Sequence, residues 1–252
     1  MKNYSILIAL IVLPSQCLSG PAPLTFADGG HHAIDYTVNT LVKIDQFSPG
    51  MGTIVDLVEG GLVIAWVDAY EDSRFNMSGG QIGGSLNAWD DSELTIVGGE
   101  IGVGVYARDS SRLDISGGLL DSQVQIFDNV EAAISGGVIS GFVKAWHDSR
   151  LTISGGTITE YIAAVEGGLI TLVGSNFAVD GKPVAYGDFA GEFGTTGFIT
   201  GTLASDDALD IEFRLIGVGG DITFVPEPAT VLLLGLGGLS LLRRRSFIRL
   251  RP

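Results

Sequence analysis

The sequence predicts an all-β protein whose body is a single-stranded parallel β-helix, a solenoid of about seven 19-residue coils. Glycine pairs recur at 60–61, 79–80, 98–99, 117–118, 136–137 and 155–156, so every step is 19 residues. Within each block apolar and polar residues alternate, which is the period of a strand. Apolar residues also recur at equivalent positions of successive blocks, as the core of a stacked solenoid requires. A signal peptide and a C-terminal transmembrane helix are predicted to flank this body.

The first element, residues 1–19, is predicted to be a secretory signal peptide. A lysine at the second position is followed by a short apolar stretch at residues 5–13. Cleavage after Ser19 and cleavage after Ala27 both fit, because small residues stand before each position. The only cysteine, Cys17, excludes a disulfide framework and a cysteine-based metal site.

The stacked coils are predicted at residues 52–184, after an N-terminal cap with an irregular first coil at residues 28–51. One inward column contains Phe75, Leu94, Leu113, Ala132, Leu151 and Ile170. A surface column alternates in sign and contains Arg74, Glu93, Arg112, Glu131 and Arg150. Opposite charges on adjacent strands contribute roughly 0.2–1 kcal/mol, so we interpret this column as structural. Right-handed coiling is favoured because the blocks lack hexapeptide periodicity, and each glycine pair is expected at a turn with positive φ.

Acidic residues stack in a further column, which is expected to lie at a turn. With neighbours one place on, its members are Glu71, Asp72, Asp90, Asp91, Asp109 and Asp128. Stacked carboxylates repel one another unless they are solvated, protonated or bridged by a cation such as Ca²⁺. Two interpretations stay open, ordinary turn residues or a calcium-binding ladder. No other metal or cofactor is predicted.

Aromatic side chains form an external column beside these acids. The column contains Tyr70, Trp89, Phe127 and Trp146, with Arg108 between the aromatic residues. Exposed aromatic stripes can stack on sugar rings or on a protein partner, or they can be covered by other parts of the chain. We therefore treat these four residues as candidate ligand-facing positions.

Residues 185–224 lose the 19-residue period and are predicted to be a C-terminal cap and linker. Two alternating segments, residues 198–203 and 211–216, are expected to form a terminal strand pair. Such a pair would cover the open end of the solenoid, where unpaired strand edges otherwise promote association.

The C-terminal end has three consecutive parts. Val225, Pro226, Glu227 and Pro228 precede the apolar residues 229–242, and Arg243, Arg244 and Arg245 follow. An apolar helix of this length spans roughly 21 Å, short of the ~30 Å hydrocarbon core, but snorkelling arginines extend its reach. The arginine cluster stays in the cytoplasm and places the preceding body outside it. A buried helix is the alternative for the apolar run.

This tail resembles the PEP-CTERM sorting signal of Gram-negative bacteria over residues 225–245; residues 246–252 extend beyond the pattern. In that family an exosortase, a membrane transpeptidase, recognises the Pro-Glu-Pro element and processes the tail. The resemblance implies that Pro226, Glu227 and Pro228 are recognition residues. It also implies an inner-membrane intermediate held by residues 229–242, then sorting to the cell surface or extracellular matrix.

The charge and the motifs limit the classes of function that this protein could have. Residues 28–224 carry 28 acidic and eight basic residues, a net charge of −20, which excludes nucleic-acid binding. No catalytic residues are predicted, because His31, His32 and His147 show no mutual relation and the acids follow the repeat. We expect a non-enzymatic structural or adhesive protein that associates with exopolysaccharide or with itself. The alternatives are a polysaccharide-binding or polysaccharide-degrading β-helix protein, or a calcium-dependent adhesin.

Overall fold

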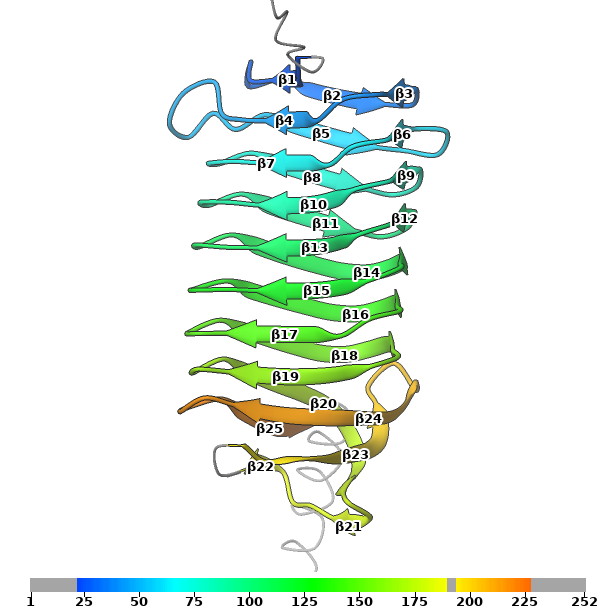
Figure 1. The fold of residues 1–252 in the computed structure, drawn as a ribbon, viewed down its shortest axis with the longest axis vertical. Helices are drawn as coiled ribbons and strands as arrows, with labels where there is room; N and C mark the ends of the chain where they lie inside the picture. Colours follow the sequence, from blue (N-terminus) through cyan, green and yellow to red (C-terminus); the bar gives the residue numbers. More distant parts are fainter. Residues whose placement is uncertain (1–21, 190–193, 228–252) are drawn as a thin grey trace, which may run out of the picture.

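The computed structural model describes residues 22–189 and 194–227, in which every regular element is a β-strand. These strands form a parallel solenoid of about eight turns, one more than the sequence predicts, with ~19-residue coils. In Figure 1 the near strands run left and the far strands run right as the chain descends, so the coil is right-handed. The predicted signal peptide (residues 1–19), residues 229–242 and the arginine cluster lie outside the described residues.

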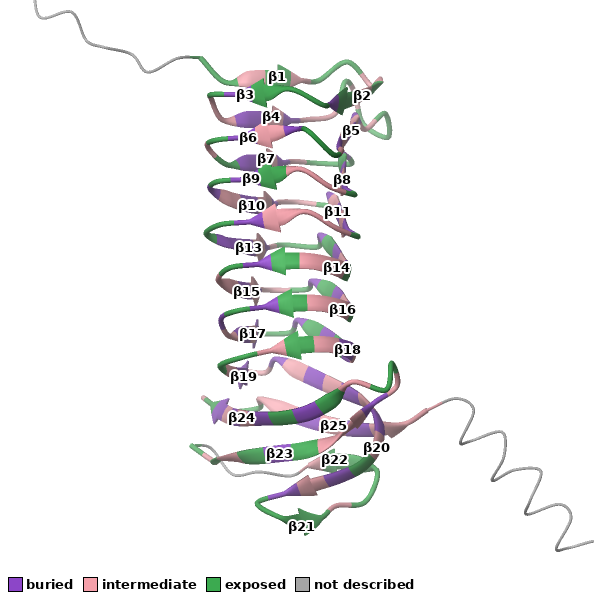
Figure 2. Ribbon diagram, turned by 90° about the vertical axis from the view of Figure 1, so that its right-hand side faces the viewer, coloured by how far each residue is buried: buried purple, intermediate pink, exposed green. Residues whose placement is uncertain are grey.

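The solenoid has three faces, and Figure 2 shows how their strands stack along its axis. Face 1 contains β1 (Leu24–Phe26), β4 (Val42–Ile44), β7 (Val67–Ala69), β10 (Ser85–Ala88), β13 (Gly104–Ala107), β15 (Gln123–Ile126), β17 (Val143–Trp146) and β19 (Tyr161–Val165). Face 2 contains β2 (His31–Ile34), β5 (Ile54–Leu57), β8 (Arg74–Met77), β11 (Glu93–Ile96) and the first parts of β14 (Arg112–Leu120), β16 (Glu131–Ile139), β18 (Arg150–Ile158) and β20 (Leu169–Val179). Face 3 contains β3 (Thr37–Val38), β6 (Leu62–Val63), β9 (Gln81–Ile82), β12 (Glu100–Ile101) and the second parts of β14, β16 and β18.

The predicted register is confirmed by the parallel pairing of successive turns. Leu94 pairs with Phe75 above it and with Leu113 below it, and all three side chains are fully buried. The charge column also holds its register, since Glu93 lies between Arg74 and Arg112 and forms an ion pair of 3.1 Å with Arg74. Fully burying each large apolar side chain stabilises the fold by roughly 1.5–3 kcal/mol, so the stacked columns are the main source of stability.

The glycine pairs are needed for two different reasons, as the pair at 136–137 shows. A Cβ on Gly136 would lie 2.4 Å from the carbonyl oxygen of Ser116 in the preceding turn. Gly137 has a φ of +88°, which L residues with side chains rarely adopt. The first glycine permits the close approach of two backbones, and the second permits the turn. Because every coil needs both, the pair recurs every 19 residues.

The N-terminal segment is part of the stack. Strands β2, β3 and β4 pair in parallel with β5, β6 and β7, so residues 28–51 contain the irregular first coil that the sequence predicts. Upstream of them, β1 pairs with β4, and the side chains of Leu24 and Phe26 pack against the core. The eighth turn comes from this region, which lacks the 19-residue spacing that marks the others.

The position of β1 favours one of the two cleavage sites that the sequence leaves open. Cleavage after Ala27 would remove β1, including the hydrogen bond from the Asp45 amide to the Phe26 carbonyl (2.9 Å). We expect cleavage after Ser19, which keeps that strand. The intact mass of the exported protein measures this directly: an N-terminus at Gly20 is expected, and one at Asp28 would contradict it.

The C-terminal cap confirms the predicted strand pair. Strands β23 (Thr196–Leu203) and β24 (Ala208–Ile216) pair antiparallel, and β24 adds to face 1 by pairing in parallel with β19. The short strands β21 (Lys182–Pro183) and β22 (Gly187–Phe189) lie at the same end of the solenoid (Figure 1), where β21 pairs antiparallel with β20 and β22 pairs antiparallel with another strand of the cap. A further strand that the sequence did not predict, β25 (Asp221–Pro226), pairs in parallel with β20 and buries Ile222 and Phe224. The folded cap therefore extends to Pro226.

Candidate functional site

The predicted aromatic column is a continuous ladder on the outer side of face 1. The rings of Tyr70 and Trp89 stack with centroids 6.2 Å apart and planes 8° from parallel. The rings of Phe127 and Trp146 stack at 5.8 Å and 15°. All four side chains are half-buried, because their faces cover one another while part of each ring remains in contact with solvent. The structure brings together the four residues that the sequence singled out.

Arg108 joins the two halves of this ladder. Its guanidinium carbon lies 4.5 Å from the ring centroid of Trp89 and 5.1 Å from that of Phe127. It also lies 5.4 Å from the centroid of Tyr106, one strand position away on the same face. Such cation–π contacts contribute about 0.5–2 kcal/mol, so the arginine stabilises the ladder instead of interrupting it.

Several residues of this face were missed by sequence reasoning. Phe142 and Tyr161 stack at 5.0 Å, and Lys144 lies 4.2 Å above the Phe142 ring. The guanidinium carbon of Arg214, from the cap strand β24, lies 3.7 Å from the Tyr161 centroid. Phe142 and Tyr161 lie four positions before the aromatic column along the chain, and Lys144 lies two positions before it. Arg214 comes from the cap. Alternation along the strand places them on the same face, a signal that a single column does not reveal.

Amide side chains supply hydrogen-bonding groups between the rings. The Trp146 indole donates to Gln125 Oε1 at 3.2 Å, and Asn87 Nδ2 donates to Asp68 Oδ1 at 2.7 Å. We call the outer surface of face 1 from Tyr70 to Tyr161 the aromatic face. Its combination of rings, amides and cations on a regular array can bind an extended chain through apolar contacts with the exposed ring edges and through hydrogen bonds.

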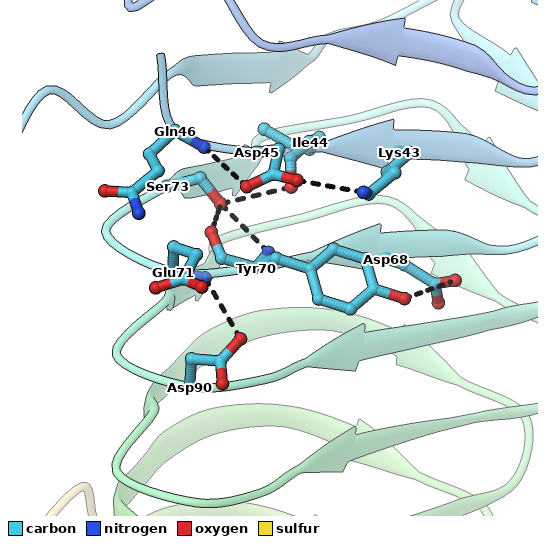
Figure 3. Close-up of polar contacts among 9 residues, drawn as sticks. All are labelled: Lys43, Ile44, Asp45, Gln46, Asp68, Tyr70, Glu71, Ser73 and Asp90. Carbon is cyan, nitrogen blue, oxygen red and sulfur yellow. Dashed lines mark hydrogen bonds and ion pairs between the residues drawn. The ribbon is translucent and has the colours of Figure 1, made fainter. Parts of the chain in front are cut away.

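Asp68 is the carboxylate at the upper end of the aromatic face, where Figure 3 shows it beside Tyr70. Partial burial raises the pKa of Asp68, while the hydrogen bonds from Asn87 and, at 3.5 Å, from the Tyr70 hydroxyl partly oppose that shift. Burial and the nearby Asp68 carboxylate likewise raise the pKa of Tyr70.

Asp68→Asn is expected to change how stability depends on pH. A raised folded-state pKa means that the native state binds the proton more tightly, so stability falls as pH rises through that pKa. The asparagine variant lacks this loss, so its melting temperature should exceed that of the wild type at pH 7, by about 2–4 °C for each kcal/mol of the difference in stability. The difference should shrink as pH falls toward 4. Thermal melts of both proteins between pH 4 and 8 measure it, and a constant difference would contradict the assignment.

The acidic column lies at the turn between face 1 and face 2. Its residues have positive φ: Glu71 (54°), Asp90 (57°), Asp109 (62°), Asp128 (58°), His147 (55°) and Glu166 (48°). Their carboxylates reach back along the axis: Asp90 Oδ2 accepts the Glu71 amide at 3.4 Å (Figure 3), and Asp109 Oδ2 accepts the Asp90 amide at 3.3 Å. The Asp90 charge raises the pKa of Glu71. These contacts explain the column as a set of turn residues, because short polar side chains tolerate a positive φ.

Within the described residues no group of three histidine, cysteine, aspartate or glutamate side chains is placed to hold a metal ion. Asp72 accepts the Gly50 amide at 2.7 Å, and His147 bridges toward Asp128 (3.2 Å) and Glu166 (3.7 Å). Calcium binding by the acidic column stays a prediction, and the turn role is the one that the hydrogen bonds support.

A thermal melt of the exported protein separates the two roles. For ordinary turn residues, millimolar Ca²⁺ and Mg²⁺ should give equal melting temperatures, since both screen charge alike. A Ca²⁺-specific rise, absent with chelator, would instead show a site that binds the folded state alone. That result would contradict the turn interpretation.

Comparison with known proteins bears on the C-terminal end. A family model described as the PEP-CTERM protein-sorting motif matches residues 224–246. The chain carries a PEP-CTERM sorting motif. No curated protein and no solved structure matched the chain. The PEP-CTERM motif implies export, passage through the membrane to the cell surface, and processing by an exosortase.

The sorting motif begins inside the folded body. Val225 pairs with Val173, and Pro226 pairs with Gly174, both within the β20–β25 ladder. Glu227 follows directly, whereas Pro228, Arg243, Arg244 and Arg245 lie outside the described residues. Among the described residues no helix has the length and apolarity needed to cross a membrane. The recognition element is thus attached to the cap without a spacer.

Proposed function

We propose that this PEP-CTERM protein is a non-enzymatic component of the cell surface or extracellular matrix that binds exopolysaccharide through its aromatic face. The observation that supports this proposal is the ladder from Tyr70 to Trp146, with its cations and amides, on one side of the rod. It forms a linear array with one position per turn, about 4.8 Å apart. A linear array fits a linear polymer that lies along the rod axis.

The chemistry of the face supports a glycan in particular. Half-buried rings offer apolar edges for the C–H groups of sugars, while amides such as Gln125 and Asn87 offer partners for hydroxyl groups. The rest of the body is strongly acidic and hydrated, which suits a protein embedded in a polar matrix. The sorting motif accounts for how the rod reaches that location.

Electrophoresis of the exported protein in gels that contain the organism's exopolysaccharide tests this proposal. We expect the wild type to be retarded and Trp89→Ala/Trp146→Ala to lose most of that retardation. Tyr36→Ala is the matched control, because Tyr36 is an exposed aromatic residue between β2 and β3, away from the aromatic face. Equal mobility of wild type and double variant, with both folded by thermal melt, would overturn the proposal.

The polysaccharide-degrading alternative is tested with the same material. The exopolysaccharide is incubated with the exported protein, and the release of reducing ends or unsaturated ends is measured over time. A binding protein leaves the polymer length unchanged. Steady turnover that survives repurification would replace the binding role with an enzymatic one.

A further inference from the structure

One part of the aromatic face has a charge opposite to the rest of the body. The strands and adjoining residues of five successive turns, 85–89, 104–108, 123–127, 142–146 and 161–165, contain no acidic residue. The same ranges contain two basic residues, Arg108 and Lys144. We call this surface the acid-free window. In a body with 28 acids and a net charge of −20, it is a local reversal of sign.

The two cations in the window form no ion pair with a carboxylate of the described residues. Elsewhere Arg74, Arg112 and Arg214 form ion pairs with Glu93, Asp114 and Glu212. The charged groups of Arg108 and Lys144 lie over aromatic rings, and the Arg108 charge also partly offsets the raised pKa of Asp68. Cations that form no close ion pair, at the centre of a surface without acids, can accept a carboxylate from a ligand.

The packing of Arg108 indicates which chemical group on a ligand would bind to it. Trp89 and Phe127 cover the guanidinium on either side, at 4.5 and 5.1 Å from its carbon to the ring centroids. Stacking of this kind leaves the N–H donors in the guanidinium plane free, and their fork matches a carboxylate. The rings also lower the local dielectric, which strengthens a charge-assisted hydrogen bond.

We propose that the acid-free window binds a polysaccharide that carries carboxylates at wide spacing, one of them on Arg108 and another on Lys144. This inference rests on the proposed function and names its ligand class. The strands bearing the two cations are two turns apart, about 10 Å at the usual strand spacing, comparable to a disaccharide in an extended chain. Asp109 and Asp128 border the window at the next turn and repel a densely charged polyanion.

The test compares two forms of one polymer, polygalacturonate that is fully methyl-esterified and polygalacturonate with sparse free carboxylates. Affinity of the exported protein for each is measured by electrophoresis in polymer-containing gels. We expect the sparsely charged form to bind roughly tenfold more tightly, as charge-assisted hydrogen bonds allow. In Arg108→Gln/Lys144→Gln this preference should disappear.

The matched control is Arg112→Gln/Arg150→Gln, which removes the same charge from face 2 and should keep the preference. Equal affinity of the wild type for both polymers would overturn the inference but leave polysaccharide binding standing. Binding of neither polymer nor exopolysaccharide would overturn the proposed function itself. Equal loss in the two double variants would show a general charge effect and also reject the window.

Discussion

Replacing Pro226, Glu227 and Pro228 with alanine should leave the precursor in the inner membrane and lower the amount at the cell surface roughly tenfold or more. A processing enzyme that recognises this element gains its specificity from contacts that alanine cannot make. Cell fractionation followed by immunoblotting measures the precursor and the mature form. Unchanged release of the mature form would reject recognition of the motif.

Two further variants separate recognition from folding, because Pro226 lies in β25. Glu227→Ala changes the residue just after that strand, so it should block processing while the melting temperature stays unchanged. Glu160→Ala is the matched control, an exposed glutamate between β18 and β19 that should have no effect on either measurement. Equal processing of Glu227→Ala and Glu160→Ala would show that the processing enzyme does not recognise Glu227.

Gly137→Val should strongly destabilise the repeat, lowering the melting temperature by about 6–12 °C for a loss near 3 kcal/mol. A β-branched side chain is strained at a φ of +88°. Its Cβ would also lie 2.8 Å from the carbonyl oxygen of Gly117 in the turn above, which is backbone and cannot move aside. Calorimetry of the exported protein measures the shift.

Gly181→Asn provides the control for this glycine. Gly181 also has a positive φ, +72°, but nothing lies within 4 Å of a Cβ built there, and asparagine tolerates this conformation. Its melting temperature should stay within about 2 °C of the wild type. Similar destabilisation at both sites would show that the contact between turns is not what makes the Gly137 substitution costly.

The repeat was predictable because its causes are local. Each turn stacks on the one before it, so equivalent positions need similar residues. This requirement produces a glycine pair every 19 residues and columns such as Phe75, Leu94 and Leu113. Strand β25 was not predictable in this way. Its alternating residues Ile222 and Phe224 stand outside the period, and they pair with β20, some fifty residues earlier in the chain. A lone strand that completes another turn carries no repeat signal.

The candidate site was predictable only in part, for a related reason. The column of Tyr70, Trp89, Phe127 and Trp146 is visible because its members share one repeat position. Phe142 and Tyr161 belong to another position, and their closeness to Lys144 depends on side-chain direction across neighbouring strands. Arg214 reaches the same surface from the cap strand β24, which lies beside β19 only in the folded protein.

The most direct test of the central claim is to fractionate the native organism with and without its exopolysaccharide. If the aromatic face binds this polymer, the wild-type protein should be recovered with the matrix when the polymer is present and in the medium or loosely on cells when it is absent. Trp89→Ala/Trp146→Ala should behave in the normal strain as the wild type does in the strain that lacks the polymer. Recovery of both proteins in the same fraction from both strains would contradict the claim.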